Sequence, residues 1–187
     1  MRVIAGQYGR RKLQAPPEQV RPTSDMLRET LFNVLTAGNS EALAGTVWLD
    51  VFAGSGAVGI EALSRGAARV YFVESARDAA VVIRQNLKSL GIAEGFEIHE
   101  RDAPVALERL AGTGVQCDVC FLDPPYAEHQ AYEQALSRVA ERGLLRPAGI
   151  VIAEHSKRWD PGDAFGRLRR YRRLDQGDAA LSFYRLA

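Results

Sequence analysis

Short apolar segments alternate with segments of helical period over most of this chain. The apolar segments, which predict buried strands, lie at residues 47–49, 70–73, 96–98, 117–122 and 150–153. The segments between them, with the apolar spacing of helices that bury one face, lie at residues 57–65, 76–90, 104–110 and 130–141. Alternation of this kind predicts a parallel sheet with helices on both faces.

The two ends of the chain predict antiparallel additions. Residues 1–20 contain short β-prone pieces punctuated by Gly and Pro, which predict a small N-terminal hairpin. A helix is predicted to begin within residues 21–25, where Thr, Ser and Asp can cap it, and to end near Gly38. Strands at 168–174 and 180–186 flank a Gln-Gly-Asp turn and predict a C-terminal hairpin. We therefore divide the chain into an extension, 1–20, and one domain, 21–187.

A glycine-rich loop connects the first predicted strand to its helix. Gly54, Gly56 and Gly59 match the pattern G-x-G-x-x-G, which lets the backbone turn tightly and approach a ligand at a helix N-terminus. Glu74 closes the second strand twenty residues later, where an acid can bind ribose hydroxyls. The loop therefore predicts a site for a nucleoside cofactor.

Both NAD and S-adenosylmethionine fit such a loop, and Asp50 distinguishes them. A carboxylate at the end of the first strand would repel a pyrophosphate and attract the ammonium of a methionine moiety. Asp102, after the third strand, can accept from the adenine amine or cap the helix that follows. We expect the cofactor to contact Asp50, Ala53, Gly54, Ser55, Gly56, Glu74, Asp102, Ala103 and Asp123.

Asp123-Pro124-Pro125-Tyr126 follows the apolar run that predicts the fourth strand. Asp123 can accept a hydrogen bond from an exocyclic NH2 group, and the Pro124 carbonyl can accept a second. The prolines stiffen the backbone and remove competing donors, and Tyr126 offers a ring for base stacking. This segment, which also fits a plain Pro-rich turn, predicts a catalytic site for an amine-bearing base.

Charge and cysteine content narrow the remaining functions. The net charge is +1, but basic residues cluster, and we expect RNA contact at Arg10, Arg11, Lys12 and Arg21 before the arginines of 167–173. Cys117 and Cys120 fall within an apolar strand, so core packing is favoured over metal binding, and no metal is expected. No apolar run reaches about 18 residues. With an early polar N-terminus, this predicts a cytoplasmic protein without membrane contact.

With these motifs in place, the chain resembles the class I S-adenosylmethionine-dependent methyltransferases. Among them it is similar to the bacterial 16S ribosomal RNA guanine-N2 methyltransferase family of the RsmD type. The resemblance extends from Ile4-Ala5-Gly6 to the tail Ser182-Phe183-Tyr184, and the stretch from Arg21 to Asn33 points to the family. It implies a Rossmann-like, doubly wound sheet of seven strands whose last strand is antiparallel.

The resemblance also implies a substrate and partner: a guanine in 16S rRNA of the small ribosomal subunit, with S-adenosylhomocysteine as the second product. We expect a monomer. A DNA methyltransferase acting on adenine N6 or cytosine N4 is the main alternative, because the same motif serves any exocyclic amine. A nicotinamide-dependent oxidoreductase and a catalytically idle RNA-binding module fit the acidic strand ends less well.

Overall fold

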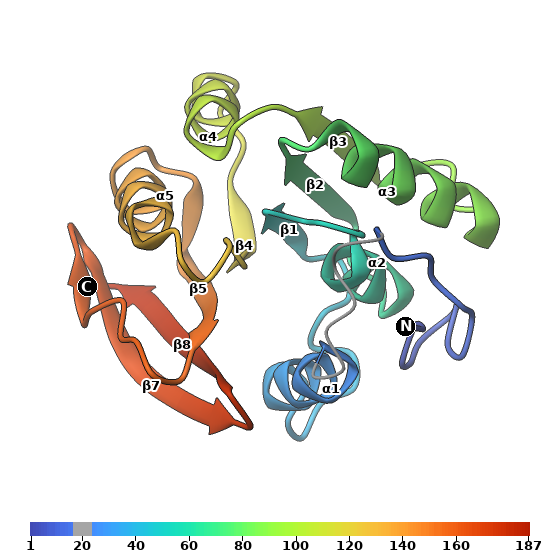
Figure 1. Cartoon of the computed structure of the whole chain (residues 1–187), viewed down its shortest axis with the longest axis horizontal. Coiled ribbons are helices and arrows are strands. Elements are labelled where there is room, and N and C mark those ends of the chain that lie inside the picture. The colour runs from blue at the N-terminus through green and yellow to red at the C-terminus, as the bar shows by residue number, and fades with distance from the viewer. Residues whose placement is uncertain (17–23) are drawn as a thin grey trace.

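The computed structural model describes residues 1–16 and 24–187, and these contain one eight-stranded sheet (Figure 1). Its strands are β1 (Val47–Val51), β2 (Arg69–Glu74), β3 (Phe96–Glu100), β4 (Cys117–Leu122), β5 (Leu145–Ser156), β6 (Ala164–Phe165), β7 (Leu168–Gln176) and β8 (Ala179–Leu186). They lie in the order β3-β2-β1-β4-β5-β8-β7-β6. The order reverses between β1 and β4, and ligands of open α/β sheets bind at such a switch point.

Strands β1 to β5 are parallel, and β8 lies antiparallel between β5 and β7. The predicted doubly wound sheet with a C-terminal hairpin is confirmed. The predicted count of seven strands omitted β6, a two-residue strand that pairs with the start of β7. Strand β5 also begins earlier than predicted, at Leu145, which aligns with Cys117 of β4. The Cys117 amide donates to the Leu144 carbonyl, and the register between β4 and β5 shifts before Val119.

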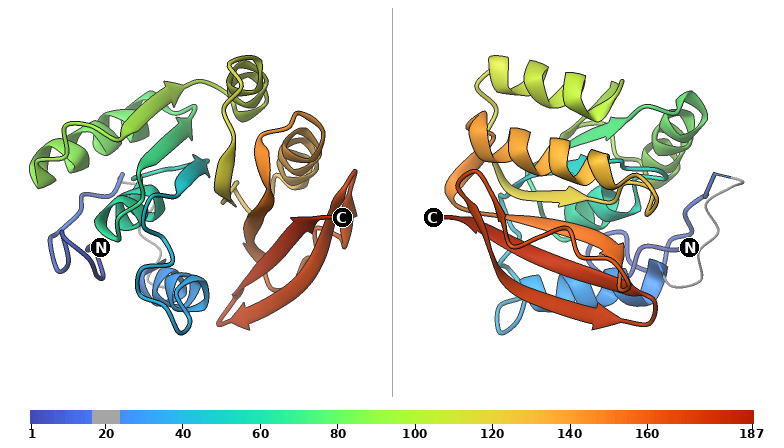
Figure 2. Two further views of the ribbon diagram at one scale, coloured as in Figure 1. Left: turned by 180° about the vertical axis from the view of Figure 1, so that it is seen from behind. Right: turned by 60° about the vertical axis from the view of Figure 1, so that its left-hand side comes forward.

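Helices cover both faces of the sheet (Figures 1 and 2). They are α1 (Ser24–Leu35), α2 (Ala57–Ser64), α3 (Arg77–Leu90), α4 (Ala103–Gly112) and α5 (His129–Glu141). Buried residues of α1, α2 and α3 share one apolar core with Phe72, Phe121 and Phe183 of the sheet. Residues of α4 and α5 form a second core on the other face.

The N-terminal segment folds back on itself beside α2 (Figure 1). Arg2 and Lys12 form an antiparallel bridge, and the Val3 amide donates to the Arg11 carbonyl. The segment is fastened to α2 by the fully buried Glu61, whose carboxylate accepts from the amides of Ile4 and Ala5 at 2.7 and 3.0 Å. The division of the chain at residue 20 stays a prediction.

Helix boundaries follow local chemistry. Gly91 ends α3 with φ 74°, a left-handed conformation that glycine adopts at little cost. The described part of α1 begins at Ser24, so the predicted start at 21–23 lies outside the described residues. None of the described helices is long and apolar enough to span a bilayer.

Candidate active site

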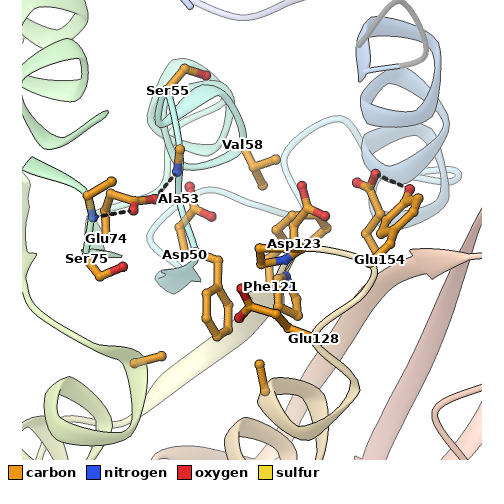
Figure 3. A pocket seen from close by; sticks show the side chains of 18 of the residues that line it. Asp50, Ala53, Ser55, Val58, Glu74, Ser75, Phe121, Asp123, Glu128 and Glu154 are labelled. Atoms are coloured by element: carbon orange, nitrogen blue, oxygen red, sulfur yellow. Dashed lines mark hydrogen bonds between the residues drawn. The ribbon is translucent and has the colours of Figure 1, made fainter. Parts of the chain in front are cut away.

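A cavity of about 1040 Å³ opens at the carboxyl ends of the central strands (Figure 3). Ligand sites typically measure about 300–1,000 Å³, so this one has room for a nucleoside cofactor and a base together. Its lining includes the glycine loop, the ends of β2 and β4, Leu27 and Leu31 of α1 and the first turn of α4. All the predicted cofactor and catalytic residues except Gly56 line this cavity, namely Asp50, Ala53, Gly54, Ser55, Glu74, Asp102, Ala103, Asp123, Pro124, Pro125 and Tyr126.

Strand register brings the acids to one face. Asp50 aligns with Phe72 of β2 and with Phe121 of β4, whose ring belongs to the core under α1–α3. Glu74 and Asp123 each come two residues after these aligned phenylalanines, and side chains two residues apart share a face. Three of the predicted acids therefore converge because neighbouring parallel strands end together.

The turn after β1 uses left-handed backbone at three positions. Phe52 has φ 62°, which costs about 1 kcal/mol or more for a residue with a Cβ. This bend lets the Ala53 amide donate to the Val73 carbonyl of β2 at 3.0 Å. Gly54 and Gly56 follow with φ 56° and 75°, values that glycine tolerates. The loop thus curls over the strand ends toward the cavity.

Gly59 and Asp50 are joined across this loop. A Cβ on Gly59 would lie 2.3 Å from the Phe72 ring, so only glycine lets α2 pack this close to β2. The Gly59 amide donates to Oδ2 of Asp50 at 2.9 Å. Asp50 is 2% exposed, and burial raises the pKa of its carboxyl to about 7, with the charge of Glu74 adding to the rise. A cationic ligand group would relieve this repulsion, which suits an ammonium.

Glu74 shapes the same loop. Its Oε2 accepts from the Gly54 amide at 2.7 Å and its Oε1 from the Ala76 amide at 2.8 Å. A carboxylate has about four acceptor sites, so two bonds leave capacity for ligand hydroxyls. Glu74 is therefore both the predicted ribose acid and a brace for the glycine loop.

Asp102 stands at the N-cap position of α4, yet its side chain makes no capping hydrogen bond among the described residues. It is exposed and lines the cavity beside the buried Ala103. The capping alternative is therefore not what this side chain does in the described structure. Its contact with an adenine amine stays a prediction.

The Asp-Pro-Pro-Tyr segment leaves β4 at the centre of the cavity. The Asp123 amide donates to the Val51 carbonyl at 3.3 Å, which continues the β1–β4 pairing by one residue. The Pro124 carbonyl lies 3.2 Å from the hydroxyl of Tyr132, a fully buried residue of α5. That hydroxyl is also 2.9 Å from the Glu154 carbonyl. Tyr132 therefore ties the motif to the end of β5.

Tyr126 and Glu154 form the far wall. The Tyr126 hydroxyl donates to Oε1 of Glu154 at 3.2 Å (Figure 3). His155, the next residue, is fully buried, and its ring nitrogens lie 2.9 Å from the Ser156 carbonyl and the Ser182 hydroxyl. The alternation of β5 thus turns Glu154 toward the cavity and His155 into the core, where burial lowers its pKa.

Sequence reasoning missed part of this wall. Leu27 and Leu31 of α1 line the cavity, although their spacing indicated only a core-facing helix. Tyr132 gave no signal, because its apolar spacing on α5 is that of an ordinary core residue. Phe52 gave none either, since its residue type does not predict positive φ.

Three of the predicted RNA-binding residues, Arg10, Arg11 and Lys12, are not among the residues that line the cavity. Arg10, Arg11 and Lys12 are exposed on the N-terminal segment, and Arg11 donates to the Ser89 carbonyl at 3.0 Å. Arg21 lies outside the described residues. All three described side chains are thus available to a large ligand at the surface.

Two of the tail arginines are neutralised within the fold. Arg170 pairs with Asp160 and Asp163, and Arg173 pairs with Asp160 and Asp175. The hydrogen bond from Arg170 lowers the pKa of Asp160 to about 2. This favours the N-terminal cluster over the tail as the surface for a polyanion.

Cys117 and Cys120 are fully buried in β4, as predicted for core packing. Burial raises the pKa of the Cys120 thiol well above its usual value, which keeps it protonated. Neither cysteine lines the cavity.

Comparison with known proteins agrees with this geometry. The family model described as "Conserved hypothetical protein 95" matches residues 1–185. Ribosomal RNA small subunit methyltransferase D of Haemophilus influenzae is 38% identical over 161 residues, which cover 84% of this chain and 79% of that protein.

Solved structures share the fold. The Thermus hypothetical protein TTHA0928 superposes with a TM-score of 0.83 at 27% identity, covering 100% of this chain and 99% of that one. SMU.776, solved in complex with SAH, has a TM-score of 0.67 at 14% identity, covering 89% of this chain and 50% of that one, and shows likeness of fold alone. The chain therefore belongs to the family described as "Conserved hypothetical protein 95", the RsmD type of the class I methyltransferases.

Proposed function

We propose that this protein transfers a methyl group from S-adenosylmethionine to the exocyclic N2 amine of a guanine in 16S rRNA. One observation carries the proposal: the Asp123–Tyr126 segment lines the same cavity as the acid-flanked glycine loop. An acceptor for an amine and a site for a cationic nucleoside cofactor are thereby adjacent. The names of the curated relatives support ribosomal RNA as the substrate class.

The residues present fit the cofactor. Asp50, which lies beside a second carboxylate, would receive the ammonium of the methionine moiety. Glu74 would receive ribose hydroxyls, and Asp102 the adenine amine. When bound, S-adenosylmethionine supplies an electrophilic methyl group on a positively charged sulfur.

Asp123 has a positioning task. The lone pair of the guanine amine is delocalised into the ring, so the amine is a poor nucleophile. By accepting one amine hydrogen on Asp123 and the other on the Pro124 carbonyl, the protein would favour a pyramidal nitrogen, whose lone pair is localised and directed toward the methyl group. Alignment of this kind contributes several kcal/mol of barrier lowering. Asp123 would take a proton only after the amine has become cationic.

The Pro124 carbonyl can play this part while it contacts Tyr132. A carbonyl oxygen has two lone pairs, and the hydroxyl of Tyr132 uses one at most. The contact holds the carbonyl in place before a substrate arrives. The two prolines, which have no N–H, keep other donors away from the same oxygen.

A base must leave its stack to reach this cavity, at a cost of a few kcal/mol. Exposed Arg10, Arg11 and Lys12 would offset part of that cost by holding phosphates, a contact that positions RNA without reading its sequence. Arg21 would add to the same cluster.

The experiment that tests the proposal is methyl transfer with a labelled cofactor. The substrates are naked 16S rRNA, isolated small subunits and double-stranded DNA, each prepared from a strain that lacks this gene. Each is incubated with the wild-type protein. Digestion to nucleosides and mass spectrometry should find N2-methylguanosine in the RNA, and mapping should place it at one position. Label in adenine N6 or cytosine N4 of DNA, with none in RNA, would overturn the proposal.

A further inference from the structure

A second carboxylate stands beside Asp123 in the cavity. Ala153 of β5 aligns with Leu122 of β4 in the last pair of these parallel strands, and the next residues are Asp123, just past the end of β4, and Glu154, still within β5. Residues in register on parallel strands extend to the same face of the sheet. Figure 3 shows the Glu154 and Asp123 side chains on the same side, with Asp123 between Asp50 and Glu154.

Glu154 is held from several directions. The Tyr126 hydroxyl donates to its Oε1 at 3.2 Å, and the Tyr132 hydroxyl lies 2.9 Å from its carbonyl. From the other side, β8 pairs Leu181 with Glu154, and Leu181 also lines the cavity. A carboxylate has about four acceptor sites, so a glutamate that accepts from a tyrosine can also accept from a ligand.

Glu154 lies on a strand farther from the glycine loop than Asp50 and Glu74, so we expect a different role for it. The strand order places β4 between β1 and β5, so Glu154 lies on the side of Asp123 away from the glycine loop. Leu181, which aligns with Glu154 on β8, lines the cavity, as do Leu27 and Leu31 of α1, and apolar side chains of this kind suit the faces of a base. Glu154 is thus a carboxylate in position to accept a hydrogen bond from the edge of the base, on a strand next to that of Asp123.

The bases differ at the atom next to their amine. In guanine, the amine on C2 is flanked by N1–H, which is a hydrogen-bond donor. In adenine and cytosine, the ring nitrogen next to the amine carries a lone pair and is an acceptor. An ionised carboxylate only accepts, so a second carboxylate beside the amine acceptor favours guanine and repels the other two.

We propose that Glu154 is a specificity-determining residue that accepts the N1–H hydrogen bond of the target guanine. The proposal rests on the function proposed above and deepens it, since it names the group that distinguishes guanine from other amine-bearing bases. Asp123 accepts a hydrogen bond from the reactive amine, and Glu154 accepts one from the adjacent N1–H group.

The test compares two bases with two variants. Guanine at the mapped position is replaced by 2-aminopurine, which keeps the reactive amine but carries a lone pair at N1. The RNA is made by splinted ligation and, where required, reconstituted into small subunits. Glu154→Gln replaces the carboxylate with an amide that still accepts from Tyr126 and can donate to N1. Glu133→Gln, on the exposed face of α5, removes the same charge outside the cavity.

Wild-type protein and Glu133→Gln should prefer guanine about ten-fold or more in kcat/KM, because a site built for one hydrogen-bond pattern leaves polar groups unpaired with the other. Glu154→Gln should narrow that preference at least about five-fold, since its amide can donate to 2-aminopurine. The missing O6 of 2-aminopurine affects all proteins alike and cancels in the comparison.

An active Glu154→Gln with the wild-type preference would overturn this inference and leave the proposed function intact. Absence of transfer to either RNA by the wild-type protein would overturn the proposed function, and this inference with it. If Glu154→Gln does not fold, as seen by circular dichroism, Glu154→Ala replaces it. Glu154→Ala should also lose the preference, and a retained preference would again overturn the inference.

Discussion

Oε2 of Glu74 accepts a hydrogen bond from the Gly54 amide at 2.7 Å, so the acid that ends β2 fixes the loop that follows β1. Its second oxygen accepts from the Ala76 amide, at the start of α3. Glu74 is 8% exposed, and both bonds are therefore shielded from water. A residue expected to meet only the ligand thus also holds the backbone that forms the ligand site.

Glu74→Gln should weaken both functions. A glutamine has one acceptor oxygen, so its NH2 group would face one of the two amides that Glu74 now satisfies. We expect a loss of about 1–3 kcal/mol in the free energy of unfolding, measured by urea denaturation. Affinity for S-adenosylmethionine should fall at least about ten-fold by calorimetry, which corresponds to about 1.4 kcal/mol.

Glu100→Gln is the matched control, because Glu100 aligns with Glu74 on β3 but pairs with Arg84 at the surface. An exposed pair contributes about 0–1 kcal/mol, so this variant should unfold nearly as the wild type does. Equal effects of the two substitutions would contradict the role given to Glu74.

The strands and helices could be predicted because apolar spacing reports burial locally. Asp50, Glu74 and Asp123 could be placed together because parallel strands end at one edge, whatever the detailed packing. The relation between Asp50 and Gly59 could not, since it depends on how closely α2 approaches Phe72. The third glycine of the loop pattern is typical of close packing between helix and strand, but the pattern does not show that the amide of Gly59 donates to Asp50.

Other features of the structure could not be predicted because they depend on contacts between elements that are distant in the sequence. Leu27 of α1 has the same spacing whether it faces a ligand or only the core. Tyr132 contacts Pro124 and Glu154 through one hydroxyl, a relation among three elements that no spacing reveals. Arg170 and Arg173 looked like a basic patch because the sequence does not show that Asp160 lies between them.

Asp123 substitutions should separate chemistry from cofactor binding. Asp123→Ala removes the acceptor for the amine, so kcat for methyl transfer should fall about 100-fold or more, within the range for a positioned acid–base group. Asp123→Asn keeps one acceptor oxygen and should lose less. Asp123 is also expected to contact the cofactor, so the dissociation constant for S-adenosylmethionine should rise in both variants, but by less than about ten-fold, equivalent to under about 1.4 kcal/mol, and far less than kcat falls. Near wild-type turnover by Asp123→Ala would remove the role of this residue.

Tyr132→Phe should loosen the Pro124 carbonyl without emptying the core. The ring remains, but two carbonyl oxygens lose their contact with a buried hydroxyl. We expect about 1–3 kcal/mol of destabilisation in urea and a several-fold drop in kcat, with cofactor affinity unchanged. Tyr171→Phe, on the exposed face of β7, is the control and should alter neither quantity. A Tyr132→Phe protein with wild-type stability and reduced kcat would still support a positioning role for this hydroxyl. Full activity would show that the hydroxyl does not position the Pro124 carbonyl.

Asp50 should make the free protein less stable as pH rises. Its carboxyl has an ordinary pKa of 3.8 when unfolded and about 7 when folded. The folded state therefore binds more protons between about pH 4 and 7, and the free energy of unfolding falls as pH rises through that window. Above pH 7 the Asp50 carboxyl is ionised in the folded state, and the free energy of unfolding is then lowered by the full cost of burying its charge.

Asp50→Asn should remove this dependence. Without cofactor, the variant should be more stable than the wild type at pH 8, by on the order of 1–3 kcal/mol, and the difference should vanish near pH 4. Groups such as His155 titrate in both proteins and cancel. Asp178→Asn, at an exposed turn, should follow the wild-type curve. Parallel stability curves for Asp50→Asn and the wild type from pH 4 to 8 would show that Asp50 does not titrate as stated.

The N-terminal basic cluster should set the salt dependence of RNA binding. Each phosphate contact lowers log K by about 0.7–0.9 per unit of log salt, because bound counterions are released. Arg10→Gln with Lys12→Gln should therefore reduce the magnitude of the slope by about 1.5 and weaken binding similarly for all sequences.

Arg167→Gln with Arg169→Gln is the control, because it removes the same charge from the tail, and it should change the slope by less than about 0.5. Fluorescence anisotropy across a salt series measures both. The opposite pattern would move the RNA-binding surface to β7, since only contacts with phosphates, and not net charge, make the two double variants differ.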